Sequence, residues 1–138
     1  MSPQWIGLVA AASTFLGVWI GHVSVRKIEY VSPSVWAPSL AALCLGSLLE
    51  IGALFSENDC FSAALGIFGI TVLWDALEFW RQHHRVEEGH APANPNNPRH
   101  RRLLAKSSAA TTIDWLARNP TRRQLSAEDL AEIIEARR

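Results

Sequence analysis

The sequence predicts an all-α protein whose first half lies in a membrane and whose second half lies in water. Apolar residues dominate three segments, at about 5–25, 35–55 and 60–80, and each has the roughly 20 residues that a helix needs to cross a bilayer. Charge divides the chain in the same way. Residues 1–80 contain two basic and six acidic residues, whereas residues 81–138 contain eleven basic and seven acidic ones. One compact, water-soluble fold of the whole chain is therefore not expected.

The first segment, Trp5 to Val25, differs from the other two in having no formally charged residue. No formally charged side chain precedes Arg26, so the segment lacks the polar face of a helix from a soluble bundle. It also lacks the basic start of a secretory signal peptide, and Arg26-Lys27 follows it as a stop-transfer signal would. We therefore expect an uncleaved membrane helix.

Basic residues predict the orientation of the helices. Arg26 and Lys27 lie between the first and second spans, and a run of arginines follows the third span, whereas the loop 56–59 has two acids and no base. Because positive residues are retained on the cytoplasmic side, the N-terminus is expected outside and the long tail in the cytoplasm. The expected location is the cell (inner) membrane, as a multi-pass protein.

Three regions follow from these patterns. Residues 1–90 are predicted to form the three-helix membrane domain, with the third helix continuing past Trp80 as far as Gly89, a suitable C-cap. Residues 91–110, rich in proline, asparagine and basic residues, are interpreted as a linker. Residues 111–138 are expected to form a cytoplasmic tail with two short helices, at about 112–118 and 126–136. The apolar stripe of the second helix could bind a partner protein.

Small residues mark two expected helix-packing faces. Gly17 and Gly21 have GxxxG spacing, and the third span repeats the pattern at Ser62, Gly66 and Gly69. Such residues let helix backbones approach closely in lipid. Two interpretations stay open: packing of the three helices on one another, which we favour, and association with another membrane protein or a second copy.

Four ionisable residues within the spans are candidate functional residues, because charges in hydrocarbon are costly. His22, Asp75 and Glu78 are expected near the cytoplasmic boundary, and Glu50 towards the opposite side of the bilayer. One interpretation is a proton or cation path; the alternative is structural, with Glu78 pairing Arg81 or Arg85. A metal site is a weaker possibility, because His83, His84, Glu87 and His90 are clustered without a recognised ligand motif. We expect neither a metal nor another cofactor.

The segment after the third span carries a short polar signature. Leu73-Trp74 and Glu78 precede Arg85, Val86, Glu87, Gly89, Pro92, Asn94 and Pro95, and His22 and Glu29-Tyr30 stand at the end of the first span. On these residues the chain, from about Trp5 to Arg99, resembles a family of small, uncharacterised prokaryotic integral membrane proteins that is classed only as a domain of unknown function. Glu50 and Asp75 do not match the family pattern, and residues 100–138 extend beyond it. The resemblance implies three membrane helices and no known activity.

No sequence motif for catalysis or nucleic-acid reading is present, so neither an enzyme nor a nucleic-acid partner is expected. The sequence favours an accessory or scaffolding subunit of a membrane complex, in contact with the lipid bilayer and with itself or another membrane protein. The alternative is a small homo-oligomeric transporter or channel for protons or cations, using the intramembrane carboxylates.

Overall fold

The computed structural model describes residues 3–114, 131–132 and 135. Within these residues it contains four helices and no strand: α1 (Trp5–Val31), α2 (Trp36–Leu54), α3 (Asp59–Glu87) and α4 (Pro98–Lys106). The predicted all-α fold with three long apolar helices is confirmed. Of the two predicted tail helices, the first lies mostly outside the described residues, and only 131–132 and 135 of the second are described, in helical conformation.

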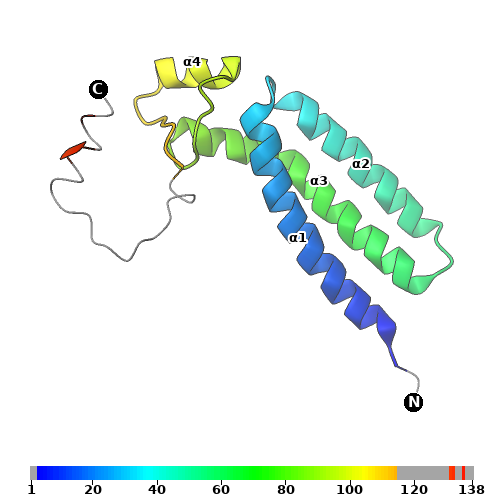
Figure 1. Cartoon of the computed structure of the whole chain (residues 1–138). Coiled ribbons are helices and arrows are strands. Elements are labelled where there is room, and N and C mark those ends of the chain that lie inside the picture. The colour runs from blue at the N-terminus through cyan, green and yellow to red at the C-terminus, as the bar shows by residue number, and fades with distance from the viewer. Residues whose placement is uncertain (1–2, 115–130, 133–134, 136–138) are drawn as a thin grey trace.

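Helix α3 is the central element of the membrane domain. It packs against both α1 and α2, and Figure 1 shows the three helices side by side with alternating directions along the chain. The connections, residues 32–35 and 55–58, are short, so consecutive helices turn back on themselves. Helices α1 and α3 therefore run in the same direction, and their C-terminal ends lie at the same end of the domain (Figure 1).

Small side chains at every fourth position let α1 approach α3. The buried residues of α1 are Ser13, Gly17, Gly21, Val25 and Glu29. This four-residue repeat runs as one stripe along the helix and is the geometry of small-residue helix packing in membranes. The stripe begins with Ser13 and ends with Glu29. Packing of α1 on α3 therefore also buries the Glu29 carboxylate.

The contact between α2 and α3 is equally close. A Cβ atom added at Gly46 would lie 2.8 Å from the backbone nitrogen of Leu73 and 2.9 Å from the carbonyl oxygen of Gly69. No side chain fits between the two backbones at this point. Where the three helices meet, a small core forms from Val25, Val35, Ala42 and Phe79.

Most large apolar side chains of the three helices face outward. Phe15 is 71% exposed and Leu48 is 65% exposed, for example, and such exposure over whole helices is not tolerated in water. Each of the three helices is long and apolar enough to cross a membrane. Together these features are those of a multi-pass membrane protein.

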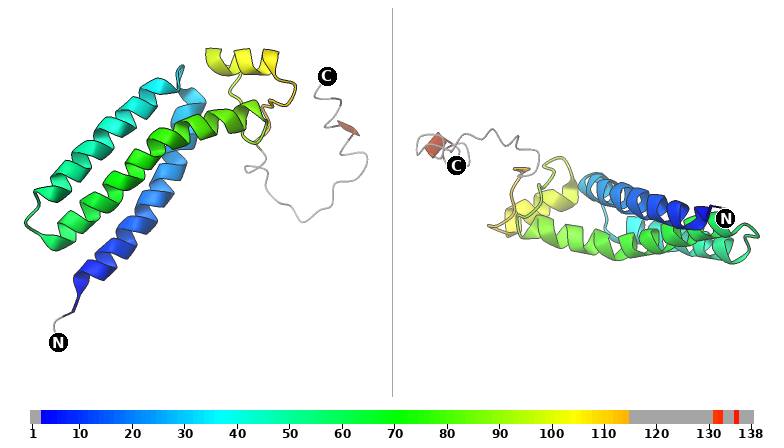
Figure 2. Two further views of the ribbon diagram at one scale, coloured as in Figure 1. Left: turned by 180° about the vertical axis from the view of Figure 1, so that it is seen from behind. Right: turned by 90° about the horizontal axis from the view of Figure 1, so that it is seen from below.

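Beyond the apolar part of α3 the chain folds back on itself. Helix α3 continues past Trp80 to Glu87, Gly89 takes a φ of 77°, and the following segment returns to α4 (Figure 2). A second small core holds this region, with Val86, Ala91 and Ala93 buried against Leu103 and Leu104. We call residues 88–114 the polar head.

The polar head includes the segment 91–110, for which the composition predicts a linker. Helix α4 begins there because the Asn97 side chain accepts a hydrogen bond from the Arg99 backbone nitrogen at 3.0 Å and Pro98 occupies the first helical turn. The two leucines of α4 then pack on Val86. The cap was present in the sequence, but the proline-rich composition around it favoured an extended segment.

Candidate functional site

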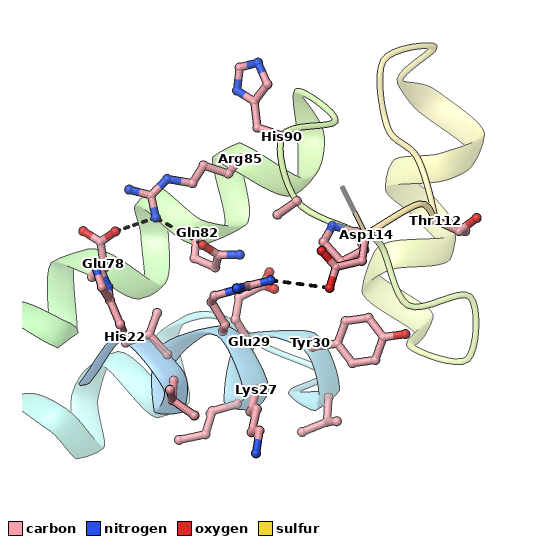
Figure 3. Close-up of a pocket in the computed structure, with 17 residues that line it drawn as sticks. His22, Lys27, Glu29, Tyr30, Glu78, Gln82, Arg85, His90, Thr112 and Asp114 are labelled. Carbon is pink, nitrogen blue, oxygen red and sulfur yellow. Dashed lines mark hydrogen bonds and ion pairs between the residues drawn. The ribbon is translucent and has the colours of Figure 1, made fainter. Parts of the chain in front are cut away.

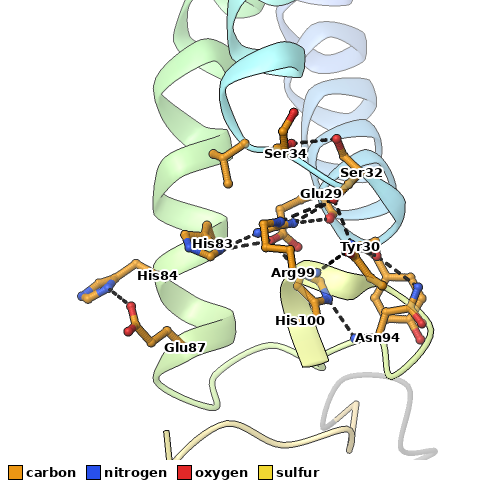
Figure 4. Close-up of polar contacts among 12 residues, drawn as sticks. Glu29, Tyr30, Ser32, Ser34, His83, His84, Glu87, Asn94, Arg99 and His100 are labelled. Atoms are coloured by element: carbon orange, nitrogen blue, oxygen red, sulfur yellow. Dashed lines mark hydrogen bonds and ion pairs between the residues drawn. The ribbon is translucent and has the colours of Figure 1, made fainter. Parts of the chain in front are cut away.

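The densest group of polar contacts in the described residues lies where the polar head meets the C-terminal end of α1. Glu29 is its centre, with a side chain that is only 2% exposed. Its Oε1 accepts hydrogen bonds from Arg99 Nη1 at 2.9 Å and from His100 Nε2 at 3.1 Å (Figure 4). The two donors come from the first turn of α4, 70 residues away along the chain. We call Glu29, Arg99 and His100 the Glu29 clasp.

The His100 ring has one tautomer that fits its surroundings. Its side chain is fully buried, and its Nδ1 lies 2.8 Å from the backbone N–H of Asn94, which can only donate. Nδ1 must therefore accept, and the ring proton resides on Nε2, where it is donated to Glu29. The histidine thus connects α1 to both α4 and the segment before it.

The polar head also caps the C-terminus of α1. Arg99 Nη2 donates to the Glu29 carbonyl oxygen at 2.7 Å, and the amide of Asn97 donates to the carbonyl oxygens of Tyr30 and Ser32 at 3.1 and 2.9 Å. Asn94 Nδ2 reaches the Tyr30 carbonyl as well, at 3.1 Å. The last carbonyls of a helix have no partner within it, and here side chains of the head satisfy them. His83 of α3 completes the group, because its ring contacts Arg99 Nη1 (Figure 4).

A cleft of about 1080 Å³ lies beside the clasp, between the C-terminal parts of α1 and α3 (Figure 3). Ala91, Pro92, Thr112 and Asp114 of the polar head line one side of it. Charged and polar side chains line it together with apolar ones; the polar group includes His22, Arg26, Glu78, Gln82, Arg85 and Asp114. Two ion pairs lie in its walls. Arg85 Nη1 is 2.6 Å from Glu78 Oε1, both on α3, and Arg26 Nη2 of α1 is 3.5 Å from Asp114 Oδ2 of the polar head.

The structure separates the four candidate intramembrane residues into two groups. His22 and Glu78 both line the cleft, and Asp75 stands three residues before Glu78 on α3. The Asp75 carboxylate lies against Gly21 of α1, where an added Cβ would meet it at 2.9 Å. Glu50 lies elsewhere, at the α2–α3 contact beside Gly69. Glu50 of α2 therefore contacts α3, whereas Asp75 of α3 contacts α1 on a different side of this central helix.

The candidate helix-packing residues lie at contacts within the three-helix domain. Gly17 faces Thr71 of α3, and Gly21 faces Asp75. On the other side of α3, Ser62 Oγ donates to the Ala53 carbonyl oxygen of α2 at 2.8 Å. Gly66 and Gly69 leave room there for the Glu50 side chain.

The residues of the polar signature perform several structural tasks. At Gly89 an added Cβ would lie 2.1 Å from the Ala109 carbonyl oxygen, so this turn accepts only glycine. Arg85 pairs Glu78, Pro92 lines the cleft, and the Glu87 carbonyl oxygen accepts a hydrogen bond from Ser107 Oγ at 2.9 Å. Asn94 caps α1, and Pro95 stands in the turn that precedes α4.

The weak metal candidates are divided between different partners. His84 Nε2 lies 3.0 Å from Glu88, and His90 Nδ1 lies 3.4 Å from the same carboxylate. His83 instead points towards Arg99, away from His84 (Figure 4). Among the described residues no three histidine, cysteine, aspartate or glutamate side chains are arranged so that they could hold a metal ion.

Sequence reasoning did not identify Arg99, His100 and Gln82 as members of a site. In the sequence, Arg99 belongs to the basic run that predicts orientation, and nothing in the segment 91–110 distinguishes His100. Their partner Glu29 stands about 70 residues earlier, and no periodic pattern connects positions so far apart. The signal available was the isolated acid in Arg26-Lys27-Ile28-Glu29, which requires a partner once α1 continues beyond Val25.

Three helices able to span a membrane, joined to a folded polar head that caps one of them, define a small multi-pass membrane protein. Residues 4–97 match the family model of the domain of unknown function DUF4491. The chain belongs to this family. No curated protein and no solved structure matches the chain.

Proposed function

We propose that this protein is a non-enzymatic membrane scaffold, an accessory subunit that holds a partner protein at one face of the cell membrane. The observation that carries the proposal is the Glu29 clasp. The polar head has a core of only a few side chains, yet buried charged contacts hold it in one orientation on α1. A plain spacer needs no fixed orientation, whereas a docking surface does.

The exposed side of α4 supplies the docking surface in this proposal. Arg101, Arg102 and Lys106 are exposed and form no ion pair with the described part of the chain. The acids of the polar head are already engaged, Glu88 with His84 and His90, and Asp114 with Arg26. A surface with three unpaired cations attracts an acidic partner. The distribution of basic residues favours a cytoplasmic position for this surface, with the N-terminus outside.

The test is native mass spectrometry of the tagged protein, extracted gently from its own membrane. We expect a heteromeric assembly with the wild-type chain. The triple variant Arg101→Gln, Arg102→Gln, Lys106→Gln should lose the partner, because it removes the exposed charges and none of the clasp contacts. Lys27→Gln, an exposed cation outside α4, is the matched control and should keep it. A partner retained equally by the triple variant, or no partner with the wild type, contradicts the scaffold.

A second candidate function, proton or cation transport by a homo-oligomer, rests on Glu50. Its side chain occupies the space left by Gly66 and Gly69, within a spanning helix, and it makes no hydrogen bond or ion pair with the described residues. An unpartnered carboxyl at membrane depth is a functional candidate. Because Glu50 and the group at Asp75 lie on different sides of α3, a continuous path needs several copies.

The test of this candidate is proton or cation flux into vesicles that contain the protein. Flux should fall with Glu50→Gln and not with Glu57→Gln; equal flux in both removes this candidate.

A further inference from the structure

The cleft between α1 and α3 contains a buried glutamine side chain. Gln82 of α3 is 4% exposed and lines the cleft, and Figure 3 shows its side chain between the two helices. Its Oε1 accepts a hydrogen bond from Arg85 Nη1 at 3.2 Å. Its Nε2 forms no hydrogen bond within the described residues. A buried amide therefore presents two unused donors to the cleft.

Two arginines add donors from opposite walls. Arg85 comes from α3 and Arg26 from α1, and their side chains remain 45% and 42% exposed although each pairs with a carboxylate. A guanidinium has five N–H donors in a planar fork. The ion pair and the hydrogen bond of Arg85 engage Nη1, and the ion pair of Arg26 engages Nη2. Each arginine is thus oriented by one acid and still has donors left for a ligand.

Three carboxylates around the cleft each have a cationic partner. Glu29 is held by Arg99 and His100, Glu78 by Arg85, and Asp114 by Arg26. The cleft offers unused donors on Arg26, Arg85 and Gln82, and guanidinium and amide donors together recognise a tetrahedral oxyanion.

The position of the cleft indicates which oxyanion. It opens at the ends of two helices that can span a membrane, and Val23, Val25 and Ile28 supply an apolar wall beside the donors. A free anion gains no contact energy from an apolar wall. A lipid carries its phosphate next to apolar chains, which can pack against such a wall. Binding cavities for small molecules measure about 300–1,000 Å³, so about 1080 Å³ has room for a headgroup.

We propose that this cleft is a phospholipid-binding site, in which Arg26, Arg85 and Gln82 bind the headgroup phosphate. The bound lipid fills the space between α1 and α3 and joins the polar head to the surrounding bilayer. The site is separate from the exposed cations of α4, so it does not depend on the scaffold proposal.

The test uses full-length protein in mild detergent, stripped of lipid and titrated with phosphatidylglycerol while native mass spectrometry counts the bound molecules. The double variant Arg26→Gln, Gln82→Met removes donors from both walls and leaves the Arg85–Glu78 pair intact. We expect one tightly retained lipid on the wild type and binding weaker by about tenfold or more in the double variant. Arg101→Gln, an exposed cation of α4, is the control and should bind like the wild type.

Equal retention by the wild type and the double variant overturns the site. Diacylglycerol with the same chains is the phosphate-free probe, and binding as strong as that of phosphatidylglycerol would show that the phosphate is not recognised. Tight binding of inorganic phosphate with no lipid retained would overturn the assignment to a lipid. Loss of the partner protein with retention of the lipid in the α4 triple variant would separate this site from the scaffold surface.

Discussion

A carboxylate that leaves water needs donors in place of its lost hydration, and at Glu29 a guanidinium and an imidazole provide them. The same arginine caps α1 through the Glu29 and Ser32 carbonyl oxygens. One side chain thus compensates a buried charge and ends a helix. The position of the head consequently depends on few residues, and two of them lend themselves to single substitutions.

Glu29→Gln is expected to destabilise the protein by about 2–4 kcal/mol, because it leaves the largely buried Arg99 without its counter-charge. The six tryptophans of the chain allow unfolding in mixed micelles to be followed by fluorescence. Glu57→Gln makes the same change at an exposed position in the loop between α2 and α3 and should stay within about 0.5 kcal/mol. Equal stability of the two variants would mean that the clasp does not hold the head.

Gly89→Ala is expected to undock the polar head. The alanine would adopt a φ of 77° and place its Cβ 2.1 Å from the Ala109 carbonyl oxygen, so the cost should reach about 2 kcal/mol or more. An opening made easier by that amount exposes Arg99 to trypsin roughly thirty times more often. Cleavage after Arg99, followed by mass spectrometry, measures this. Gly7→Ala, with no atom within 4 Å of the added Cβ, should leave the cleavage rate unchanged.

At the scale of elements, hydropathy predicted α1, α2 and α3 because a lipid-facing helix is apolar on most sides. The continuation of α3 past Trp80 was also predicted, to Gly89, and the helix ends at Glu87. The length of α1 was not predicted: it ends at Val31 and not near Val25, since contacts with the polar head extend it past its apolar part. The site was predicted only in part. The polar signature follows the chain and was visible, whereas the pairing of Glu29 with α4 depends on tertiary structure.

The glycines of the helix contacts should differ in their sensitivity to substitution. At Gly46 an added Cβ would meet the backbone of Leu73 and Gly69, which cannot move alone, whereas at Gly21 it would meet the end of the Asp75 side chain, which can rotate. Overpacking costs about 1–3 kcal/mol, so Gly46→Ala should fall near the upper end and Gly21→Ala near the lower. Gly7→Ala should be neutral or slightly stabilising. Unfolding in mixed micelles gives the order, and a larger loss at Gly21 would contradict it.

At the scale of the whole molecule, the charge distribution makes a prediction about sidedness. The loop 55–58 and the polar head lie at opposite ends of the three-helix domain (Figure 1). We expect Glu57→Cys, in a background with Cys44 and Cys60 replaced by alanine, to react with a membrane-impermeant maleimide on intact cells. Lys106→Cys, exposed on α4, should react only after permeabilisation. The reverse pattern would invert the proposed topology.

The separation of 70 residues between Glu29 and Arg99 also determines when the clasp can form during biosynthesis. At about 5–20 residues per second, the ribosome reaches Arg99 roughly 4–14 s after Glu29. Helix α1 acquires its packing partner only when α3 emerges, and its terminal carboxylate acquires a counter-charge only when α4 does. A nascent chain truncated before Pro98 would expose an unpaired acid at the end of its first helix. The clasp can therefore form only in a chain that has been extended to His100.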